Sequence, residues 1–344
     1  MSGCASIISN MSKLLFYAKK LKTFDFRNIS RIAKRVHEEH SRPYLLTMAD
    51  IIWCAAKYQA APTDYLQSDM FRLSHEQRTD IITAGASSEF VKRNCDLSRR
   101  DMLENKFNMY EKFSDFLGRK YFFVNEAAEK NDFDAFVKTS NLDEILVKPA
   151  TETGGGRGVR KFKSADEAWD YAVSIAPAIA EEVLTQDARV AALNPSSINT
   201  VRPLTLYRDG KISFLAIFFR IGAGGLVDNF CDGGMVTPVN IETGVIEYPA
   251  ADENVNYYEI HPITGAPIVG FEIPYFEQIK EMITKAALMI PELGYVGWDV
   301  ALTPEGPVII EGNLFASHAF FNFAGQHPDG KYFRHEFEEK MGWR

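Results

Sequence analysis

The chain has 344 residues, of which 46% are hydrophobic and 24% are charged, and its net charge is −8. This length predicts two or three domains or subdomains with ample apolar material. The acidic balance excludes a global basic field that would recruit nucleic acid or an acidic membrane, although a local basic patch could still bind a nucleotide. The four scattered cysteines include no CxxC pair, which argues against a zinc site or a disulfide framework and favours a reducing, cytoplasmic environment.

Residues 1–95 are predicted to form a helical N-terminal region. Residues 1–40 indicate one or two amphipathic helices, with apolar stripes at Leu14, Leu15, Ala18 and Leu21 and at Ile29, Ile32, Ala33 and Val36. Their basic faces are interpreted as solvated surface or as a docking surface for a partner, an acidic glycan or a membrane lipid. Lysines interrupt the early apolar residues, so we expect no signal peptide, and no apolar run is long enough to span a bilayer.

A buried helix over 47–60 and two short helices near 74–84 and 86–93 complete the helical region. The region lacks the βαβ pattern of a nucleotide-binding α/β domain. Beyond it, helices and strands mix. We expect helices over 101–117, 131–138 and 165–175, and strands over 121–124, 144–148, 159–162 and 178–183. Ser164 and Glu167 fit a capping box that begins the third of these helices.

Residues 199–260 are predicted to form short strands and glycine-rich turns. Pro274 begins a long helix that ends before Gly294 and leads into a β-hairpin over 297–313. The aromatic-rich tail from Phe315 is expected to pack back on the core. This order places the most chemically informative hairpin near the end of the chain.

In the hairpin, two apolar runs flank a Pro-Glu-Gly-Pro turn, and folding the chain about Glu305 sets Asp299 opposite Glu311. Asn313 returns to the same face because strand side chains alternate. Two carboxylates that face each other repel, and a cation between them offsets that repulsion. Oxygen ligands of this kind suit Mg²⁺. We interpret the three residues as metal ligands, with a plain edge hairpin carrying solvent-facing acids as the alternative.

The glycine-rich stretch over 154–158 is neither GxGxxG nor GxxxxGK[ST], so the Rossmann and P-loop interpretations fail. Its glycines still expose backbone N–H groups to an anion, and Arg157 adds a cation. The alternative is a flexible hairpin loop. Lys148 ends the apolar strand just before it and is predicted to contact a phosphate, because a lysine there needs an anion unless its ammonium group reaches water.

Other polar residues are weaker signals. The strand end Glu181–Leu184 offers acids and backbone groups to an adenosine, or is simply an exposed acidic edge. Arg202 and Arg220 lie within apolar runs, which predicts an anionic partner: a structural acid, a phosphate or a carboxylate substrate. Cys231 has no histidine nearby in sequence and is interpreted as a bystander. His318 could reach the hairpin, but an ordinary tail histidine is the favoured interpretation.

Taken in order, these motifs resemble the ATP-grasp superfamily over roughly 100–320. The resemblance is closest to the ATP-grasp proteins encoded beside sugar-transfer genes, which are glutamate ligase-like. Their pattern includes Asn-Thr-x-Arg, Phe-Phe-Arg-Ile-Gly, Asp-Asn-Phe and Gly-Gly, found here at Asn199–Arg202, Phe218–Gly222, Asp228–Phe230 and Gly233–Gly234. The resemblance implies an α+β ATP-grasp fold over 96–344, in which two α+β subdomains sandwich ATP. The lid-bearing subdomain would cover about 101–183, and the metal- and substrate-binding subdomain about 184–344.

The resemblance also implies roles for individual residues in binding ATP. Lys106 and Lys148 would bind the α- and β-phosphates. A lid over the triphosphate would comprise Thr153, Gly154, Gly155, Gly156, Arg157 and Gly158. Adenine would lie at Glu181, Glu182, Val183 and Leu184, and ribose at Asp187. Two Mg²⁺ ions, for which Mn²⁺ is a substitute, would be held by Asp299, Glu311 and Asn313, with Glu311 bridging them.

The implied reaction joins a small carboxylate to an amine through an acyl phosphate, for example an amino acid to a sugar acid. Arg202 would meet the γ-phosphate or the acyl phosphate, and the substrates would contact Arg220, Asp228, Asn229, Gly233 and Gly234. A kinase that phosphorylates a hydroxyl and a non-catalytic ATP-binding module in glycan assembly are the alternatives. The helical N-terminal region departs from the α/β domain of many ATP-grasp enzymes, so the substrates and the oligomeric state stay open, as does peripheral membrane association.

Overall fold

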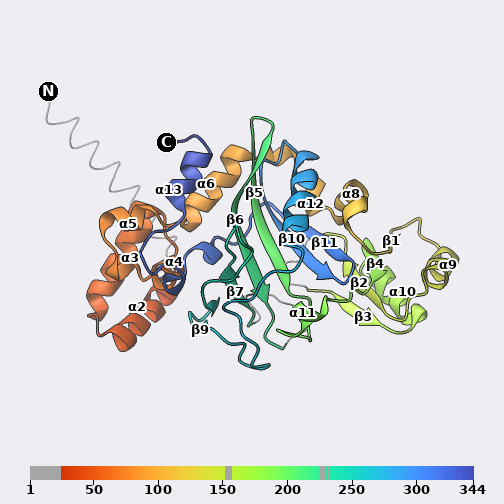
Figure 1. The fold of residues 1–344 in the computed structure, drawn as a ribbon, viewed down its shortest axis with the longest axis horizontal. Helices are drawn as coiled ribbons and strands as arrows, with labels where there is room; N and C mark the ends of the chain where they lie inside the picture. Colours follow the sequence, from red (N-terminus) through yellow and green to blue (C-terminus); the bar gives the residue numbers. More distant parts are fainter. Residues whose placement is uncertain (1–24, 152–156, 225–229, 231–232) are drawn as a thin grey trace.

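The computed structural model describes residues 25–151, 157–224, 230 and 233–344. Figure 1 shows a group of helices in red and orange at one end, a large sheet in green to blue at the centre, and a small sheet in yellow-green at the other end. Three clusters of buried apolar side chains hold the molecule together, and the most extensive one packs on the large sheet. Residues predicted to bind phosphate and metal are on these two sheets: Lys148 is on the small sheet, and Asp299 and Glu311 are on the large one.

The N-terminal helices pack through the apolar positions that their periodicity predicts. α2 covers Phe26–His40 and α3 covers Tyr44–Tyr58. The stripe at 29–36 is buried against neighbouring helices, and the docking role of the basic faces stays a prediction. The stripe at 14–21 lies outside the described residues. The shorter helices that follow are α4 (Pro62–Gln67), η1 (Met70–Arg72), α5 (His75–Thr79), α6 (Ala84–Asn94) and η2 (Leu97–Arg99).

The single helix expected over 101–117 is wrong, because the chain breaks at Asn105. This residue has extended backbone angles, forms a β-bridge with Thr151, and accepts a hydrogen bond from the Phe107 N–H at 2.9 Å, which caps a new helix. Lys106 therefore begins a helix instead of lying inside one. The three pieces are α7 (Asp101–Glu104), α8 (Lys106–Lys112) and η3 (Ser114–Phe116).

The small sheet has the antiparallel strand order β1-β4-β2-β3. In β2–β4 pairing, Lys148 lies opposite Ile179, so Lys148 and Glu181 are diagonal neighbours on one face. Two helices pack on the sheet, and the Ser164 hydroxyl caps the second by accepting a hydrogen bond from the Glu167 N–H at 3.4 Å. The elements are β1 (Tyr121–Val124), α9 (Lys130–Ser140), β2 (Ile145–Pro149), β3 (Arg160–Phe162), α10 (Ala165–Ser174) and β4 (Ala178–Glu182).

The large sheet has the antiparallel order β11-β10-β5-β6-β7-β8-β9. β5 (Thr200–Arg208) and β6 (Lys211–Ile221) are long strands joined at Asp209 and Gly210, which both have positive φ. The expectation of short strands is therefore wrong here, because two nearly continuous buried runs pair along their length. The other elements are α11 (Ala188–Ala191), β7 (Met235–Pro238), β8 (Ala250–Asp252), β9 (Tyr257–Tyr258), α12 (Phe276–Leu288), η5 (His318–Phe321), η6 (Ala324–Gln326) and α13 (Arg334–Lys340).

The last hairpin consists of β10 (Tyr295–Thr303) and β11 (Gly306–Asn313). Its tight turn begins a register that, continued without interruption, would place Asp299 opposite Ile310. A β-bulge next to Asp299 adds one residue to β11, so Asp299 instead pairs with Glu311. The pairing expected from the sequence is confirmed, and the bulge is what produces it.

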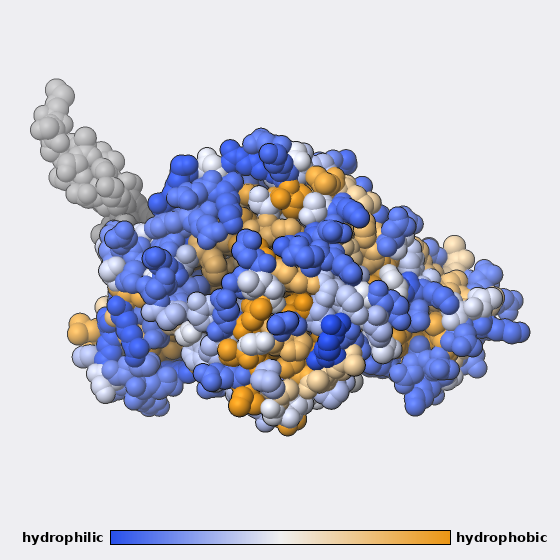
Figure 2. Space-filling view, in the orientation of Figure 1, coloured by the Kyte–Doolittle hydropathy of each residue, from blue (hydrophilic) through white to orange (hydrophobic). Residues whose placement is uncertain are grey.

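The surface carries some exposed apolar residues. Figure 2 shows hydrophobic side chains over the lower middle of the molecule, near β6, β7 and the segments beneath them in the same view. Exposed apolar residues between β9 and α12 include Ile260, Ile263 and Val269. Within the described part of the chain, no helix combines the length and the apolar character needed to cross a membrane.

Candidate active site

Three donors converge on the buried carboxylate of Glu181 at the end of β4. Lys148 Nζ donates to Oε1 at 2.8 Å, Arg119 Nε donates to Oε2 at 2.8 Å, and the Tyr110 hydroxyl also donates to Oε2. Burial alone raises the pKa of Glu181, but Arg119 and Lys148 lower it to about 2. The carboxylate is therefore ionised at neutral pH and holds two cations in place.

Arg119 joins this cluster to the large sheet. Its Nη1 donates to the Ile309 carbonyl oxygen of β11 at 2.9 Å. Burial lowers the pKa of Lys148, while Glu181 and, from the large sheet, Glu311 act to raise it. Two cations share one carboxylate, so the cluster keeps surplus positive charge next to Glu311. An anionic ligand between the sheets would meet that charge.

Asp299 is the centre of the second cluster. Arg202 on β5 holds both of its carboxylate oxygens, and Arg220 Nη1 on β6 donates to Oδ2 at 2.9 Å. The strand order β10-β5-β6 brings these side chains together. Burial raises the pKa of Asp299, but Arg202 and Arg220 lower it to about 2. The anionic partner expected for each arginine is therefore a structural acid, which is also one of the predicted metal ligands.

Glu311 lies opposite Asp299 and is in a different electrostatic position. Burial, and then the charge of Asp299, raise the pKa of Glu311. Asn313 Nδ2 donates to Glu311 Oε1 at 3.2 Å, which leaves the amide oxygen of Asn313 available to a cation. Within the described residues, no group of three His, Cys, Asp or Glu side chains could hold a metal. Two carboxylates and one amide oxygen nevertheless fit Mg²⁺, which keeps several non-protein ligands.

Residues 171–328 match the model of the family described as sugar-transfer associated ATP-grasp. The match covers slightly less than half of the chain and marks this part as similar to that family. The antiparallel sheets of the chain, with the two charged clusters between them and helices at the N-terminal side, agree with the expected ATP-grasp fold. No curated protein matches the sequence of the chain.

Solved structures also resemble this chain. VanG D-Ala:D-Ser ligase from Enterococcus faecalis has 14% identity and a TM-score of 0.41, over 69% of this chain and 59% of that one. D-alanyl-alanine synthetase A from Vibrio cholerae has 16% identity and a TM-score of 0.39, over 67% and 61%. N5-carboxyaminoimidazole synthase from Aspergillus clavatus has 10% identity and a TM-score of 0.44, over 72% and 57%. The chain spans less than two thirds of each, and the likeness carries no conclusion about reaction or substrate.

The structure describes only part of the predicted phosphate site. Lys106 begins α8, and its backbone N–H donates to the Ala150 carbonyl oxygen at 3.0 Å, just beyond the strand that carries Lys148. Arg157 and Gly158 are exposed before β3. The other lid residues lie outside the described residues: Thr153, Gly154, Gly155 and Gly156. Phosphate binding by these residues stays a prediction.

The structure describes the residues predicted to contact adenosine, and their role in binding stays a prediction. The carboxylate of Glu181 is occupied by cations, so only its backbone and its neighbours are open to adenine in this arrangement. Those neighbours, Glu182, Val183 and Leu184, are partly exposed. Asp187 caps α11 and forms an ion pair with Arg189 at 2.9 Å, which accounts for its carboxylate without a ribose.

The predicted substrate loop is described only at its end. Gly233 is exposed, with a positive φ of 89°, and Gly234 is buried. Phe230 packs edge-on against Phe320 of η5, with ring centroids 5.5 Å apart. Asp228, Asn229 and the predicted bystander Cys231 lie outside the described residues. Phe230 therefore contacts η5, and the substrate contacts of the loop stay a prediction.

Sequence reasoning missed Tyr110 and Arg119. Tyr110 is on α8, Arg119 precedes β1, and both are buried beside Glu181. Neither lies in a recognisable motif. The only signal was the charge of Arg119 directly before a strand, which is common on surfaces. Their role depends on packing between segments about 60–70 residues apart, which no local pattern encodes.

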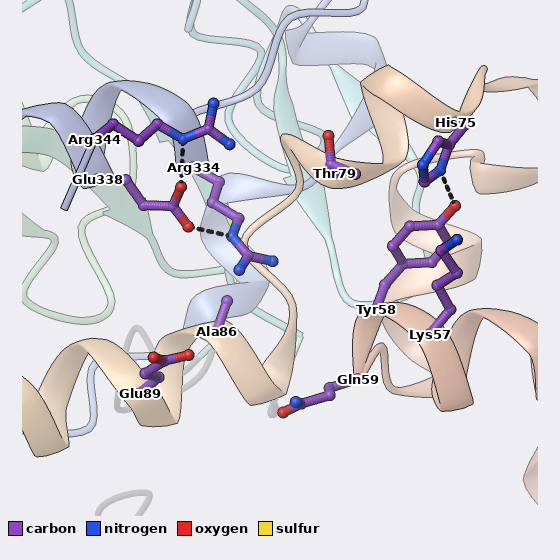
Figure 3. Close-up of a pocket in the computed structure, with 10 residues that line it drawn as sticks. All are labelled: Lys57, Tyr58, Gln59, His75, Thr79, Ala86, Glu89, Arg334, Glu338 and Arg344. Atoms are coloured by element: carbon purple, nitrogen blue, oxygen red, sulfur yellow. Dashed lines mark hydrogen bonds and ion pairs between the residues drawn. The ribbon is translucent and has the colours of Figure 1, made fainter.

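Two cavities lie away from these clusters. One of about 320 Å³ lies among α3, α5, α6 and α13; Figure 3 shows Tyr58 pointing to His75, and Glu338 held between Arg334 and Arg344. A second, of about 560 Å³, separates the N-terminal helices from the segment 324–332. None of the predicted site residues lines either cavity.

Proposed function

We propose that this chain is an ATP-grasp protein, namely an ATP-dependent carboxylate–amine ligase that forms an amide bond through an acyl phosphate and releases ADP. The observation that carries the proposal is a cluster with surplus positive charge next to a pair of acids of which one lacks an ion pair. Lys148 and Arg119 outnumber the acid that they share, while Arg202 and Arg220 pair with Asp299 and no ion pair within the described residues engages Glu311. The phosphates of a nucleoside triphosphate match the surplus positive charge, and its divalent cation matches Glu311.

In this proposal, Lys148 binds a phosphate while it stays hydrogen-bonded to Glu181, which fixes the direction of its ammonium group. Lys106, at the first turn of α8, binds a second phosphate, and the glycine-rich segment before β3 closes over the triphosphate. Bound Mg²⁺, held by the predicted ligands of the hairpin, would neutralise the charge that develops on the transferred phosphoryl group.

Arg202 and Arg220 then serve the carboxylate substrate and its acyl phosphate. Both guanidinium groups are fixed by Asp299, and a guanidinium presents more donors than one carboxylate can accept. A rigid pair of cations orients an anionic substrate toward the nucleotide, and positioning supplies much of the rate in phosphoryl transfer. The substrates in this proposal are a small carboxylate and an amine, such as a sugar acid and an amino acid, in the cytoplasm.

The test is a screen for ADP release with ATP, Mg²⁺ and pairs of carboxylates and amines. The carboxylates are the amino acids and the uronic acids, and the amines are the amino acids. Hydroxylamine in a parallel reaction traps an acyl phosphate as a hydroxamate, which mass spectrometry identifies. Carboxylate-dependent hydroxamate is the expected result. ADP release with polyols and none with carboxylates would instead support a kinase.

A matched pair of variants in one hairpin checks the metal assignment. Glu311→Ala is expected to abolish turnover and the stabilisation of the folded protein by Mg²⁺. Glu305→Ala removes an exposed acid in the turn of the same hairpin and is expected to change neither. If Glu311→Ala keeps full turnover, the metal assignment is wrong.

A further inference from the structure

A half-buried contact between His318 and Asp64 joins the N-terminal helices to the tail after the last hairpin. The Nε2 atom of His318 lies 2.9 Å from Asp64 Oδ1 on α4. The side chain of Asp64 is fully buried, and its other oxygen accepts hydrogen bonds from the Ala61 and Ala84 N–H groups at 2.7 and 3.1 Å. A carboxylate held at both oxygens accepts from a protonated Nε2, which fixes the ring and leaves Nδ1 as an acceptor.

The residues on either side of His318 contact the catalytic face of the large sheet. Ala316 packs closely on Gly297: a β-carbon added to Gly297 would lie 2.7 Å from the β-carbon of Ala316. Phe320 covers the guanidinium of Arg202, 5.7 Å from the ring centroid. Ala316 and Phe320 are each two residues from His318 in sequence, so the Cα atom of His318 lies within about 7 Å of the Cα atom of each. His318 therefore lies in the wall of the site beside Arg202.

The imidazole is also accessible. Its side chain is 27% exposed, and within residues 25–151, 157–224, 230 and 233–344 no hydrogen bond engages Nδ1. A histidine whose only task is to hold Asp64 needs neither the exposure nor the free acceptor. The second His–Asp pair of this kind, His335 with Asp80 at 3.4 Å, lies on α13 and provides a comparison for experiments.

We propose that His318 is the general base that takes a proton from the acceptor amine, and that Asp64 is the residue that positions it. This inference rests on the proposed ligase function. An amine substrate is an ammonium ion at neutral pH and has no lone pair for attack. Nδ1 accepts one of its protons, and the imidazolium that forms is stabilised by the ionised Asp64.

The proton and electron balance is complete with the proposed substrates. The ammonium gives one proton to Nδ1, and the resulting amine forms the nitrogen–carbon bond to the acyl carbon. The carbon–oxygen bond to phosphate then breaks, and phosphate leaves with its electron pair. The second proton on nitrogen goes to the departing phosphate, and His318 returns its proton to water. No oxidant, reductant or further reactant is required.

The groups that face His318 are compatible with this role. Asp64 on α4 is the charged group that contacts it, while β7 contributes no titratable side chain. Arg202 on β5 lies against Phe320, and it is bound to Asp299, as is Arg220 on β6. Their guanidinium groups can attract the carboxylate substrate.

The decisive experiment separates the two halves of the reaction. Hydroxylamine is largely unprotonated at neutral pH, so it attacks an acyl phosphate without a base. His318→Gln keeps a donor to Asp64 but lacks the base. It is expected to form hydroxamate at the wild-type rate, while ligation to the pooled amino acids falls about 100-fold or more. His335→Gln is the matched control and should retain both rates. Added imidazole should restore ligation in His318→Ala and leave the rates of the control unchanged.

The outcomes of this experiment distinguish failure of the general-base role of His318 from failure of the proposed ligase function. Equal loss of hydroxamate and amide in His318→Gln would mean a structural role only and would overturn the base assignment. No hydroxamate from the wild-type protein would refute the ligase function and the base with it. The ring tautomer gives a readout without turnover. Nitrogen NMR of the wild-type protein should show His318 protonated at Nε2, and protonation of the neutral ring at Nδ1 would contradict the proposal.

Discussion

Glu181 on the small sheet is buried and Glu311 on the large sheet is half-buried, and their environments shift their pKa values in opposite directions. Glu181 accepts hydrogen bonds from Lys148, Arg119 and Tyr110, and its pKa is lowered to about 2. The pKa of Glu311 is raised, first by burial and then by Asp299. Burial alone therefore does not decide the direction of the pKa shift of these acids. The number of cations that contact each carboxylate decides it.

This difference separates an acid that stabilises the fold from an acid that awaits a ligand. The cluster around Glu181 is satisfied, and its surplus charge is positive. The pair of Asp299 and Glu311 has its two arginines on one member only. The first cluster is expected to lose stability when its acid is neutralised, and the second is expected to gain.

The largest effect is expected for Glu181→Gln. The substitution leaves Lys148 and Arg119 buried without their anion, and such a loss costs about 3–5 kcal/mol of unfolding free energy. Urea denaturation followed by circular dichroism measures it. Glu182→Gln, at the next and partly exposed position, is the control and should change stability by less than about 0.5 kcal/mol. A loss no larger than that of the control would show that the cluster contributes no net stability.

Glu311→Gln is expected to act in the opposite direction on stability. It removes a buried charge that repels Asp299, which should raise the unfolding free energy by on the order of 1 kcal/mol at pH 8 without Mg²⁺. Turnover should be lost in the same protein. The same urea titration with and without Mg²⁺ measures both effects. A destabilised Glu311→Gln protein would mean that Glu311, like Glu181, is already paired.

The smallest effect concerns pH and Mg²⁺. Because the pKa of Glu311 is raised above its ordinary 4.5, the folded protein holds this proton more tightly than the unfolded chain. The stability that this proton contributes is present at low pH and is lost as pH rises through the raised value. Mg²⁺ needs the ionised form, so its stabilising shift in Tm, a few degrees at pH 8, should shrink toward pH 5. A shift of the same size at both values would contradict metal binding by Glu311.

Local patterns in the sequence predicted most of the fold. The helix at 47–60, the four strands of the small sheet and the helix after Pro274 follow from apolar periodicity and caps, and the structure has each of them within a few residues. The break at Asn105 was not predictable, because it depends on a bridge to Thr151 that only the folded chain forms. The long β5–β6 hairpin was missed because its buried runs lack the alternation that marks a strand.

Candidate site residues were predictable where one strand or one hairpin contains them. Asp299 and Glu311 share a hairpin, and Lys148 ends a strand, so their charges stand out among apolar neighbours. Arg119 and Tyr110 reach Glu181 only through packing between distant segments, and nothing in the neighbouring sequence marks them. His318 was interpreted as an ordinary tail residue because its partner, Asp64, is 254 residues away in sequence.

The bulge in the last hairpin means that the site depends on strand register as well as on residue types. Removing one residue from β11 before Glu311 would leave every acid and amide in the sequence. Glu311 would then take the place of Ile310, which the uninterrupted register sets opposite Asp299, so the two acids would still face each other once the bulge was lost. Among chains related to this one, a hairpin that is one residue shorter and has no bulge would therefore keep the predicted ligand pair. Alignments of such chains have to allow a gap at the bulge so that the two acids stay matched.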